Sequence, residues 1–328
     1  MNPLDSENWI YLATRSEMEG RSGEAEKELL RAFEVDRQFE PRWALANFYF
    51  RTGNSQAALA WARKTLDFGA GNLTSVFQLC WTVSGNAGEI LDKAVPHRAE
   101  VLAQYLQFLD GTGRVDEAGD VAKLLLPLAS PGEVPMLAAH CTRSLEAGQA
   151  EAAIAVWNGL IARGLIAQER VEPRAGRPSV DTGFQGEMNG QGFAWGVQPV
   201  DGISVQRLAD RRGVRVVLSR NEPEHSAILR QWIALASNRI YRYRITYAAS
   251  GMDGAGLKWV IYSPRSKAVL MSAALRKDDR QSRVIEARFE SPADGQLAML
   301  ELRYDREPGT VRPEGSIVFS GLALQAEQ

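Results

Sequence analysis

The sequence predicts a two-domain α plus β protein, in which an N-terminal solenoid of paired α-helices precedes a C-terminal antiparallel β-sandwich. Three observations predict this. Glycines recur at intervals of 28 to 35 residues through the first half, a period typical of stacked helical hairpins. Two prolines and a glycine in residues 169–180 interrupt the helical pattern. Beyond them, polar and apolar residues alternate with the period of two typical of strands.

Length and charge limit the classes of protein. The 328 residues are enough for two domains with cores of their own. Residues 1–174 carry 17 basic and 23 acidic side chains, and residues 175–328 carry 21 and 17. The resulting charges, −6 and +4, are too small to predict a nucleic-acid-binding protein. No run of 18 apolar residues occurs, so we expect no membrane span.

Residues 1–168 are predicted to form four to five helical hairpins. An alanine follows four of the recurring glycines by five residues, and Gly85 with Ile90 is a degraded copy. The small residue allows two helices to approach, and a large residue on the partner helix fills the gap. The third repeat is irregular, with a short second helix. The glycines are Gly20, Gly53, Gly85, Gly113 and Gly148, and the alanines are Ala25, Ala58, Ala118 and Ala153.

The first repeat resembles the tetratricopeptide repeat, with Trp9, Leu12, Ala13, Ala25, Leu29 and Ala32 at positions of the family pattern and Ser16 replacing a large aromatic residue. The resemblance implies a concave groove that binds a protein or peptide through the first helix of each pair. The alternative is a solvated helix face whose aromatic residues serve packing. By family position, the groove residues are Tyr11, Thr14, Trp43, Asn47, Arg51, Gln104 and Gln107.

Residues 181–328 are predicted to form the sandwich. In residues 240–247, three tyrosines and Ile245 point to one side and Arg242, Arg244 and Thr246 to the other. Six or more such strands without intervening helices predict an antiparallel sandwich. The predicted strands are 214–218, 228–235, 240–247, 257–262, 284–289, 297–304 and 316–324.

The order of these signals over residues 181–326 resembles jelly-roll carbohydrate-binding modules and their galactose-binding-like relatives. The resemblance is carried by Gly183-Phe184, by Gly192-Phe193-Ala194-Trp195 and by the closing strand 317–324. It implies a glycan-binding module. The family often has an acidic residue in the last strand, where this chain has Ser320-Gly321, so we do not expect a structural calcium site. We also expect no cofactor.

One outward side of the predicted strands is rich in arginine. Arginine forks suit carboxylate, phosphate or sulfate groups, so this side is a candidate glycan, anion or partner surface. The alternative is a solvated sheet with cross-strand Arg–Glu pairs. Trp195, Trp232 and Trp259 are either sugar platforms or core residues; we include Trp195 in the site and expect Trp259 to point inward. The remaining candidates are Arg215, Arg242, Arg244, Lys258, Tyr262, Glu286, Arg288 and Arg303, with Glu301 beside them.

No strong catalytic motif occurs in the sequence. His97, His140 and His225 are far apart, and the zinc-protease, nucleophile-elbow and P-loop patterns are missing. His140 is predicted to be a core residue. Cys80 and Cys141 are predicted to be buried thiols, and the alternative is a disulfide between them. Glu286 and Glu301 are formally a hydrolase pair, but neighbouring arginines would keep both ionised and so remove the general acid. Asp278-Asp279 is either a cation site or a charged hairpin tip.

The sequence therefore favours a non-catalytic binding or scaffold protein, with a protein partner on the helices and a glycan on the sandwich. The double resemblance implies a bacterial protein of surface-polysaccharide or envelope assembly. The alternatives are a protein scaffold with a structural sandwich and an accessory domain of a glycan-active enzyme. The first nine residues lack a signal-peptide core, so an extracytoplasmic or periplasmic location requires that the native chain begin upstream.

Overall fold

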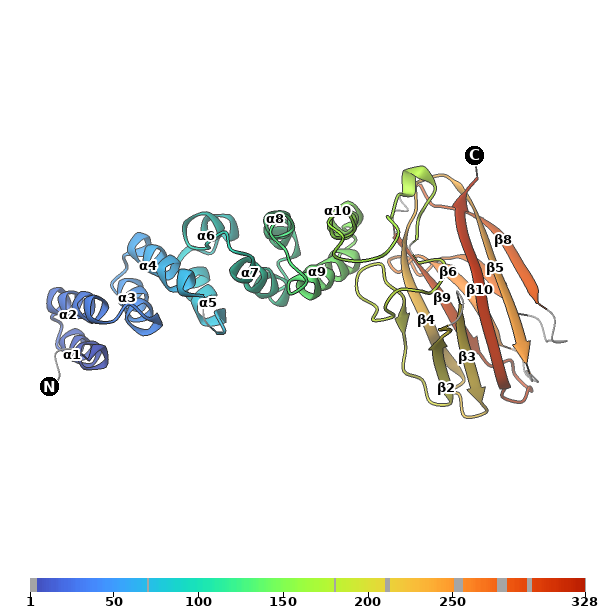
Figure 1. Cartoon of the computed structure of the whole chain (residues 1–328), viewed down its shortest axis with the longest axis horizontal. Coiled ribbons are helices and arrows are strands. Elements are labelled where there is room, and N and C mark those ends of the chain that lie inside the picture. The colour runs from blue at the N-terminus through green and yellow to red at the C-terminus, as the bar shows by residue number, and fades with distance from the viewer. Residues whose placement is uncertain are drawn as a thin grey trace. The chain divides into compact units, whose positions relative to one another are not determined.

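The computed structural model describes residues 5–69, 71–179, 181–209, 213–250, 256–275, 282–293 and 297–327. Its contacts divide the chain into two compact units, Met1–His140 and Cys141–Gln328. We call them the helical unit and the sandwich unit. The predicted fold class is confirmed, because helices fill the first half and two antiparallel sheets the second (Figure 1).

Ten α-helices follow one another in five pairs over the described residues. The third pair ends in the shortest of these helices, at the repeat that the sequence predicts to be irregular. The pairs are α1 (Ser6–Met18) with α2 (Ser22–Val35), α3 (Phe39–Arg51) with α4 (Ser55–Phe68), α5 (Thr74–Ser84) with α6 (Ala87–Lys93), α7 (Ala99–Gly111) with α8 (Val115–Leu125), and α9 (Val134–Glu146) with α10 (Ala150–Ala162).

The recurring glycines lie at the turn inside each pair. All five have φ between +66° and +80°, a left-handed conformation that costs other residues about 1–2 kcal/mol. At four of these turns, the amide after the glycine donates to the carbonyl five residues back, as the Arg21 amide does to Ser16. This Schellman arrangement ends a helix at a glycine. The sequence period therefore follows from how each first helix ends.

The residues at the fifth position after these glycines lie at the centre of the helical packing. The four alanines and Ile90 are completely buried. In the first pair, Ala25, Leu29 and Ala32 of α2 are buried, as are Ala13 and Ser16 of α1. Small side chains at these contacts allow the helix backbones to approach closely.

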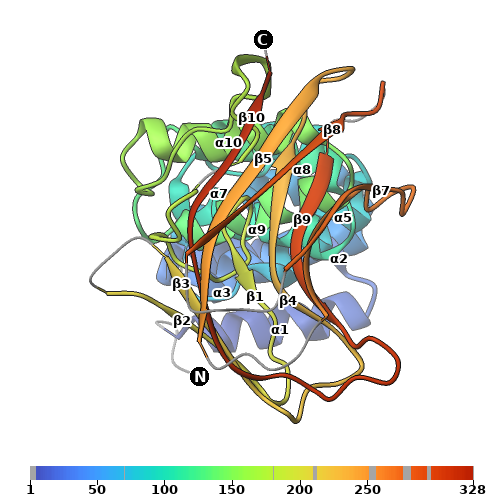
Figure 2. The ribbon, with the colours of Figure 1, turned by 90° about the vertical axis from the view of Figure 1, so that its right-hand side faces the viewer.

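Two antiparallel sheets of five strands each form the sandwich. Figure 2 shows β10, β5 and β8 side by side. In hydrogen-bonding order, the β4 sheet contains β1 (Gly196–Val197), β4 (His225–Ala234), β9 (Leu297–Asp305), β6 (Leu257–Tyr262) and β7 (Val269–Ala274), and the β5 sheet contains β2 (Ile203–Arg207), β3 (Val214–Ser219), β10 (Glu314–Ala326), β5 (Ile240–Ser250) and β8 (Arg283–Glu290).

The strand order is that of a jelly roll. One sheet contains the order β3-β10-β5-β8 and the other contains the order β4-β9-β6-β7. Consecutive strands from β3 to β6 therefore alternate between the two sheets, as in paired Greek keys. The sequence predicts all strands except β1, β2 and β7. All three lie at sheet edges, and β1 and β2 are also short. An edge strand has a partner strand on one side only, so its sequence shows a weaker alternation of polar and apolar residues.

The core between the sheets is strongly aromatic. Tyr241, Tyr243, Ile245 and Tyr247 point into it, while Arg242 and Arg244 are exposed. The rings of Trp195 and Trp259 meet edge to face, with their centroids 6.0 Å apart. The predicted alternation along β5 and the inward direction of Trp259 are therefore confirmed.

The last helical pair packs against the sandwich inside the sandwich unit. Trp157 of α10 contacts Phe193 edge to face, with ring centroids 6.0 Å apart. Gly192 lies so close that a Cβ there would fall 2.5 Å from the Trp157 ring. The Gly192 amide also donates to Thr142 Oγ1 of α9 at 2.7 Å. The contacts thus divide the chain inside α9, whereas the sequence analysis placed the boundary after residue 168.

Neither cysteine is disulfide-bonded: Cys80 and Cys141 are buried free thiols, as the sequence predicts. Burial raises the pKa of Cys80 to about 12, so its thiol is protonated at neutral pH and packs as a small apolar group. In the part of the chain that the structure describes, no helix has the length and apolar character needed to cross a bilayer.

Candidate functional site

The outer face of the β5 sheet carries five of the predicted site residues. Arg242 and Arg288 share Glu327, with Arg242 Nη2 and Arg288 Nε lying 2.8 and 2.9 Å from its Oε1. Arg244 pairs with Glu286 at 3.4 Å. Each of these three arginines therefore already has a carboxylate partner, which Arg242 and Arg288 share, as the cross-strand alternative anticipates.

The fifth residue, Arg215 of β3, differs from the other arginines on this face. It has no ion-pair partner among the described residues, and it borders a cavity of about 610 Å³. Small outward side chains form the cavity, because Ser316, Val318 and Ser320 of β10 lie between Arg215 and the end of β5 at Ser250. We call this cavity the serine hollow. It brings a guanidinium together with the hydroxyl groups of four serines, Ser250, Ser282, Ser316 and Ser320.

The remaining candidates lie on the other sheet, so the prediction of a single common face is wrong. Lys258 and Tyr262 belong to β6 and Arg303 to β9, all in the β4 sheet. Alternation along a strand distinguishes inward from outward residues, but it does not tell which of two sheets a strand joins. The outward sides of the two sheets face away from each other across the core.

Trp195 was also wrongly placed in the site. It is 0% exposed and packs in the core, and its Nε1 donates to the carbonyl oxygen of Asp181 at 3.1 Å. Trp232 is the half-buried tryptophan of the three candidates. It points outward on β4, opposite Met299 of β9. The signal that identifies it is its register: it lies one position from the inward Ile233.

On the outer face of the β4 sheet, charged groups surround Tyr262. The Arg303 guanidinium lies 4.5 Å from the ring centroid of Tyr262 and also pairs with Glu301, which is buried. Burial, assisted by the charge of Glu301, raises the pKa of Tyr262. Arg303 therefore covers one side of this ring with a cation–π contact.

At the end of that face, Asp305 joins Lys258 and His225. Lys258 Nζ and His225 Nδ1 each lie 2.8 Å from one of its oxygens. Burial by itself would raise the pKa of Asp305, but the hydrogen bonds from Lys258 and His225 outweigh it and lower this pKa. A folded-state pKa below the unfolded value of about 3.9 means that the ionised form stabilises the fold.

We therefore expect a pH-dependent contribution from Asp305. It is fully present above about pH 4 and is lost as the pH falls through the lowered folded-state pKa. The urea midpoint of the wild type should drop more between about pH 5 and pH 2.5 than that of Asp305→Asn, whose side chain does not titrate. Equal drops in the two proteins would contradict the role of Asp305.

The structure brings together no catalytic pair from the sequence candidates. Glu286 lies on the β5 sheet and Glu301 on the β4 sheet, so they face opposite outer sides and share no cleft. His140 is buried, with Nδ1 3.0 Å from Asp110, which confirms its core position. Asp278 and Asp279 lie outside the described residues. Within those residues, no cluster of three or more His, Cys, Asp or Glu could hold a metal ion.

Four of the seven predicted groove residues surround one cavity in the helical unit. Thr14 of α1 and Trp43, Asn47 and Arg51 of α3 line a space of about 240 Å³. Their polar groups have partners within the chain: Arg51 holds Glu17 with two hydrogen bonds of 2.7 Å, and Asn47 Nδ2 donates to the Trp43 carbonyl. The walls of this cavity are therefore held in place before any partner binds.

The other three predicted groove residues lie outside this cavity. Tyr11 is 69% exposed on α1. Gln104 of α7 braces the segment before α5, because its Oε1 accepts from the Leu73 amide at 3.0 Å and its Nε2 donates to Gly71. Gln107 is exposed on the same helix. Gln104 thus has a structural role that the family position does not reveal.

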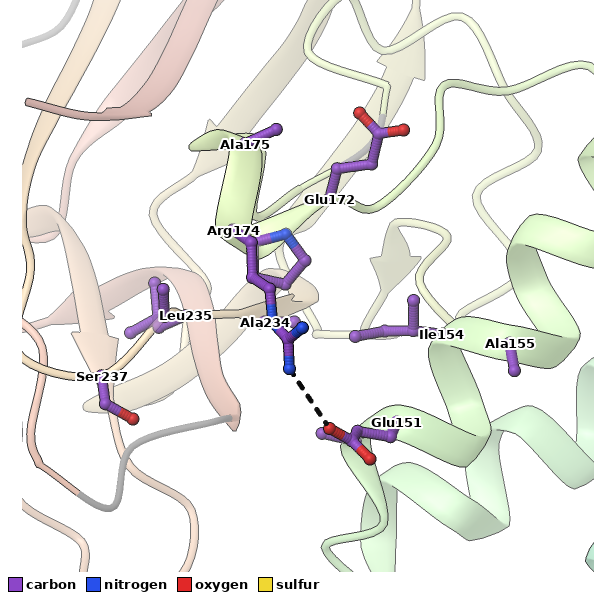
Figure 3. A pocket seen from close by; sticks show the side chains of 12 residues that line it. Glu151, Ile154, Ala155, Glu172, Arg174, Ala175, Ala234, Leu235 and Ser237 are labelled. Carbon is purple, nitrogen blue, oxygen red and sulfur yellow. Dashed lines mark ion pairs between the residues drawn. The ribbon is translucent and has the colours of Figure 1, made fainter. Parts of the chain in front are cut away.

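The sandwich unit has a further cavity, of about 710 Å³, beside α10. Figure 3 shows Ile154 of α10 and Leu235, just past β4, lining it, with Arg174 of the short helix η1 (Pro173–Ala175) paired to Glu151 across its mouth. The pair is long, at 3.9 Å, and both side chains are almost fully exposed. Such an ion pair contributes little stability.

Comparisons with known proteins give the chain no family. No family model matches the sequence, and no curated protein matches it. Solved structures similar to it include a family 4 carbohydrate-binding module at 10% identity and TM-score 0.35, covering 45% of this chain and 98% of that one. The carbohydrate-binding module TmCBM61 in complex with β-1,4-galactotriose matches at 14% identity and TM-score 0.29, and the match covers 40% of this chain and 88% of that chain.

The enzymatically active domain of tailspike protein 4 of bacteriophage CBA120 is also similar. It matches at 10% identity and TM-score 0.33, covering 48% of this chain and 22% of that chain. The structural neighbours thus include non-catalytic binding modules as well as a domain of an enzyme.

Proposed function

We propose that this chain is a non-catalytic binding protein whose β-sandwich binds an acidic glycan in the serine hollow, while its helical repeats engage a protein partner. The observation that carries the proposal is Arg215, which has no ion-pair partner among the described residues and borders a cavity lined with hydroxyl groups. A role in bacterial surface-polysaccharide or envelope assembly is part of the same proposal.

The charge on Arg215 supports an anionic ligand. Its neighbours Arg242, Arg244 and Arg288 already have carboxylate partners, whereas Arg215 has none in the described part of the chain and can bind one from outside. A guanidinium binds a carboxylate or sulfate with two parallel hydrogen bonds. A uronate or a sulfated sugar carries such a group.

The remaining lining of the hollow supports a sugar. Each of Ser250, Ser316 and Ser320 offers a hydroxyl that both donates and accepts hydrogen bonds, as the hydroxyl groups of a glycan require. Because the described lining residues include no exposed aromatic ring, charge and hydrogen bonds supply the affinity, and salt should weaken it.

For the helical half, the cavity between α1 and α3 supports a partner surface. Thr14, Trp43, Asn47 and Arg51 meet there, and their fixed positions reduce the entropy that binding a peptide would cost. Two alternatives remain open to test. One is a protein scaffold whose sandwich is structural, and the other is an accessory domain of a glycan-active enzyme.

Calorimetric titration with acidic and neutral polysaccharides tests the glycan proposal. We expect polygalacturonate or dextran sulfate to bind the wild type and unsulfated dextran not to bind. Arg215→Ala should weaken binding about tenfold or more, the range for a lost charge-assisted hydrogen bond. Arg215→Lys should recover only part of it, because an ammonium lacks the planar fork.

Arg242→Ala is the matched control. Arg242 is an arginine on the same face that already pairs with Glu327 and does not line the hollow, so its loss should leave binding unchanged. Equal weakening by both variants would mean a diffuse charge effect and count against the hollow. Binding of none of these polysaccharides would favour the structural sandwich, and release of reducing ends from a bound polysaccharide would favour the enzyme alternative.

A further inference from the structure

A second cavity of the sandwich unit, of about 890 Å³, lies at one end of the β4 sheet. Its walls come from four places: the α9–α10 turn, the end of β4, the β6–β7 turn with the start of β7, and Pro292 and Leu297 between the end of β8 and the start of β9. We call it the Trp232 cavity. Its volume falls within the range of about 300–1,000 Å³ typical of small-molecule sites.

The Trp232 cavity has both apolar and polar walls, and five side chains contribute to the apolar part. Leu235, Leu270, Pro264 and Pro292 line it together with the Trp232 ring. Trp232 points away from the core, since it lies opposite Met299 on the outer side of the sheet. A half-buried tryptophan beside leucine and proline forms a flat apolar wall for a ligand.

The β6–β7 turn is a defined structure at the rim of this cavity. The Ser263 amide donates to the Ala268 carbonyl oxygen, and the Lys267 amide donates to the Ser263 carbonyl oxygen. The Ser266 amide donates to the side-chain Oγ of Ser263 at 3.3 Å. These bonds set the course of the backbone through Arg265, which lines the cavity. A pre-organised turn positions a ligand group without the cost of ordering a loop.

The rim carries a positive charge that no described residue compensates. Arg265 has no ion-pair partner among the residues that the structure describes. The acidic residue of the lining, Glu146, is engaged by Arg143, whose Nη1 lies 3.4 Å from its carboxylate. Charge complementarity therefore favours an anion above the apolar walls.

We infer that the Trp232 cavity binds a small amphipathic anion, with its apolar body against Trp232 and Leu270 and its carboxylate, sulfate or sulfonate on Arg265. This inference is independent of the glycan proposal, because the serine hollow lies on the β5 sheet and the Trp232 cavity adjoins the β4 sheet.

Fluorescence titration with anilinonaphthalene sulfonate, an aromatic ring system with one sulfonate, tests it on the full chain. We expect saturable binding to one site, displaced by decanoate and much less by decanol, which has the same chain length without the charge. Arg265→Ala should weaken the binding of the probe about tenfold. Trp232→Leu should weaken both the probe and decanoate while the fold is retained.

Lys267→Gln is the matched control, since Lys267 is a cation of the same turn that does not line the cavity. It should leave binding unchanged. Equal displacement by decanol and decanoate, equal weakening by Arg265→Ala and Lys267→Gln, or no effect of Trp232→Leu would each overturn the inference. Arg215→Ala should leave binding of the probe intact, which separates this result from failure of the glycan proposal.

Discussion

Replacing Trp195 with alanine is expected to destabilise the sandwich by about 3–5 kcal/mol, the usual cost of a large cavity in a core. The indole is completely buried between Phe184 and Trp259, and its Nε1 donates to the Asp181 carbonyl oxygen. The variant therefore loses aromatic contacts and one of the two hydrogen bonds to the Asp181 carbonyl, which still accepts from the Phe184 amide. Urea denaturation of the full chain, followed by near-UV circular dichroism, measures the effect.

Trp232→Ala is the control for this experiment. Trp232 belongs to the same sandwich but lies on its outer side, so its removal should cost clearly less stability than the removal of Trp195. If Trp195→Ala kept wild-type stability and lost only glycan binding, Trp195 would be a ligand platform after all and our description of the core would be wrong.

Replacing Gly192 with alanine is expected to lower the free energy of unfolding by about 3 kcal/mol, the sum of two costs. Part of it, roughly 1–2 kcal/mol, comes from φ of +55°, which is strained for any residue with a Cβ. The rest comes from overlap, because the new methyl would lie 2.5 Å from the Trp157 ring and overpacking typically costs about 1–3 kcal/mol. The α9–α10 pair should then separate from residues 189–195, detectable as faster hydrogen exchange there.

Two controls separate the strain from the overlap. Gly164 has φ of +69°, and no atom lies within 4 Å of the place that a Cβ would take there, so Gly164→Ala should show the strain alone. In a Trp157→Ala background the main overlap is relieved and a contact of 3.1 Å with Cys141 Sγ remains, so Gly192→Ala should then cost little more than Gly164→Ala. Such a double-mutant cycle isolates the coupling between the two residues. Additive effects would refute the direct contact.

Much of the fold could be predicted because its signals are local. The glycines end helices through their own backbone conformation, and the alternation in β5 reflects one buried and one solvated side. The irregular third pair was also visible, as a shortened interval before Gly113. Each of these features depends on residues within a few positions of one another.

The candidate site was harder to predict, because it depends on which strands become neighbours. Arg215 and Arg303 are both outward residues, yet they lie on different sheets. The ion pairs of Arg242 and Arg288 with Glu327 join residues up to 85 positions apart, and they set Arg215 apart from the other arginines described on this face. Nothing local in the sequence marks Arg265 or three of the serines of the hollow, Ser250, Ser282 and Ser316.

The sequence alone determined the two architectures and the inward or outward direction of most strand residues, because backbone conformation and burial period act over short distances. Tertiary structure decided the division of the arginines between two faces, the burial of Trp195, the packing of α10 against Gly192, and the positions of both cavities. These depend on strand order and on contacts across long stretches of chain, which no local pattern encodes.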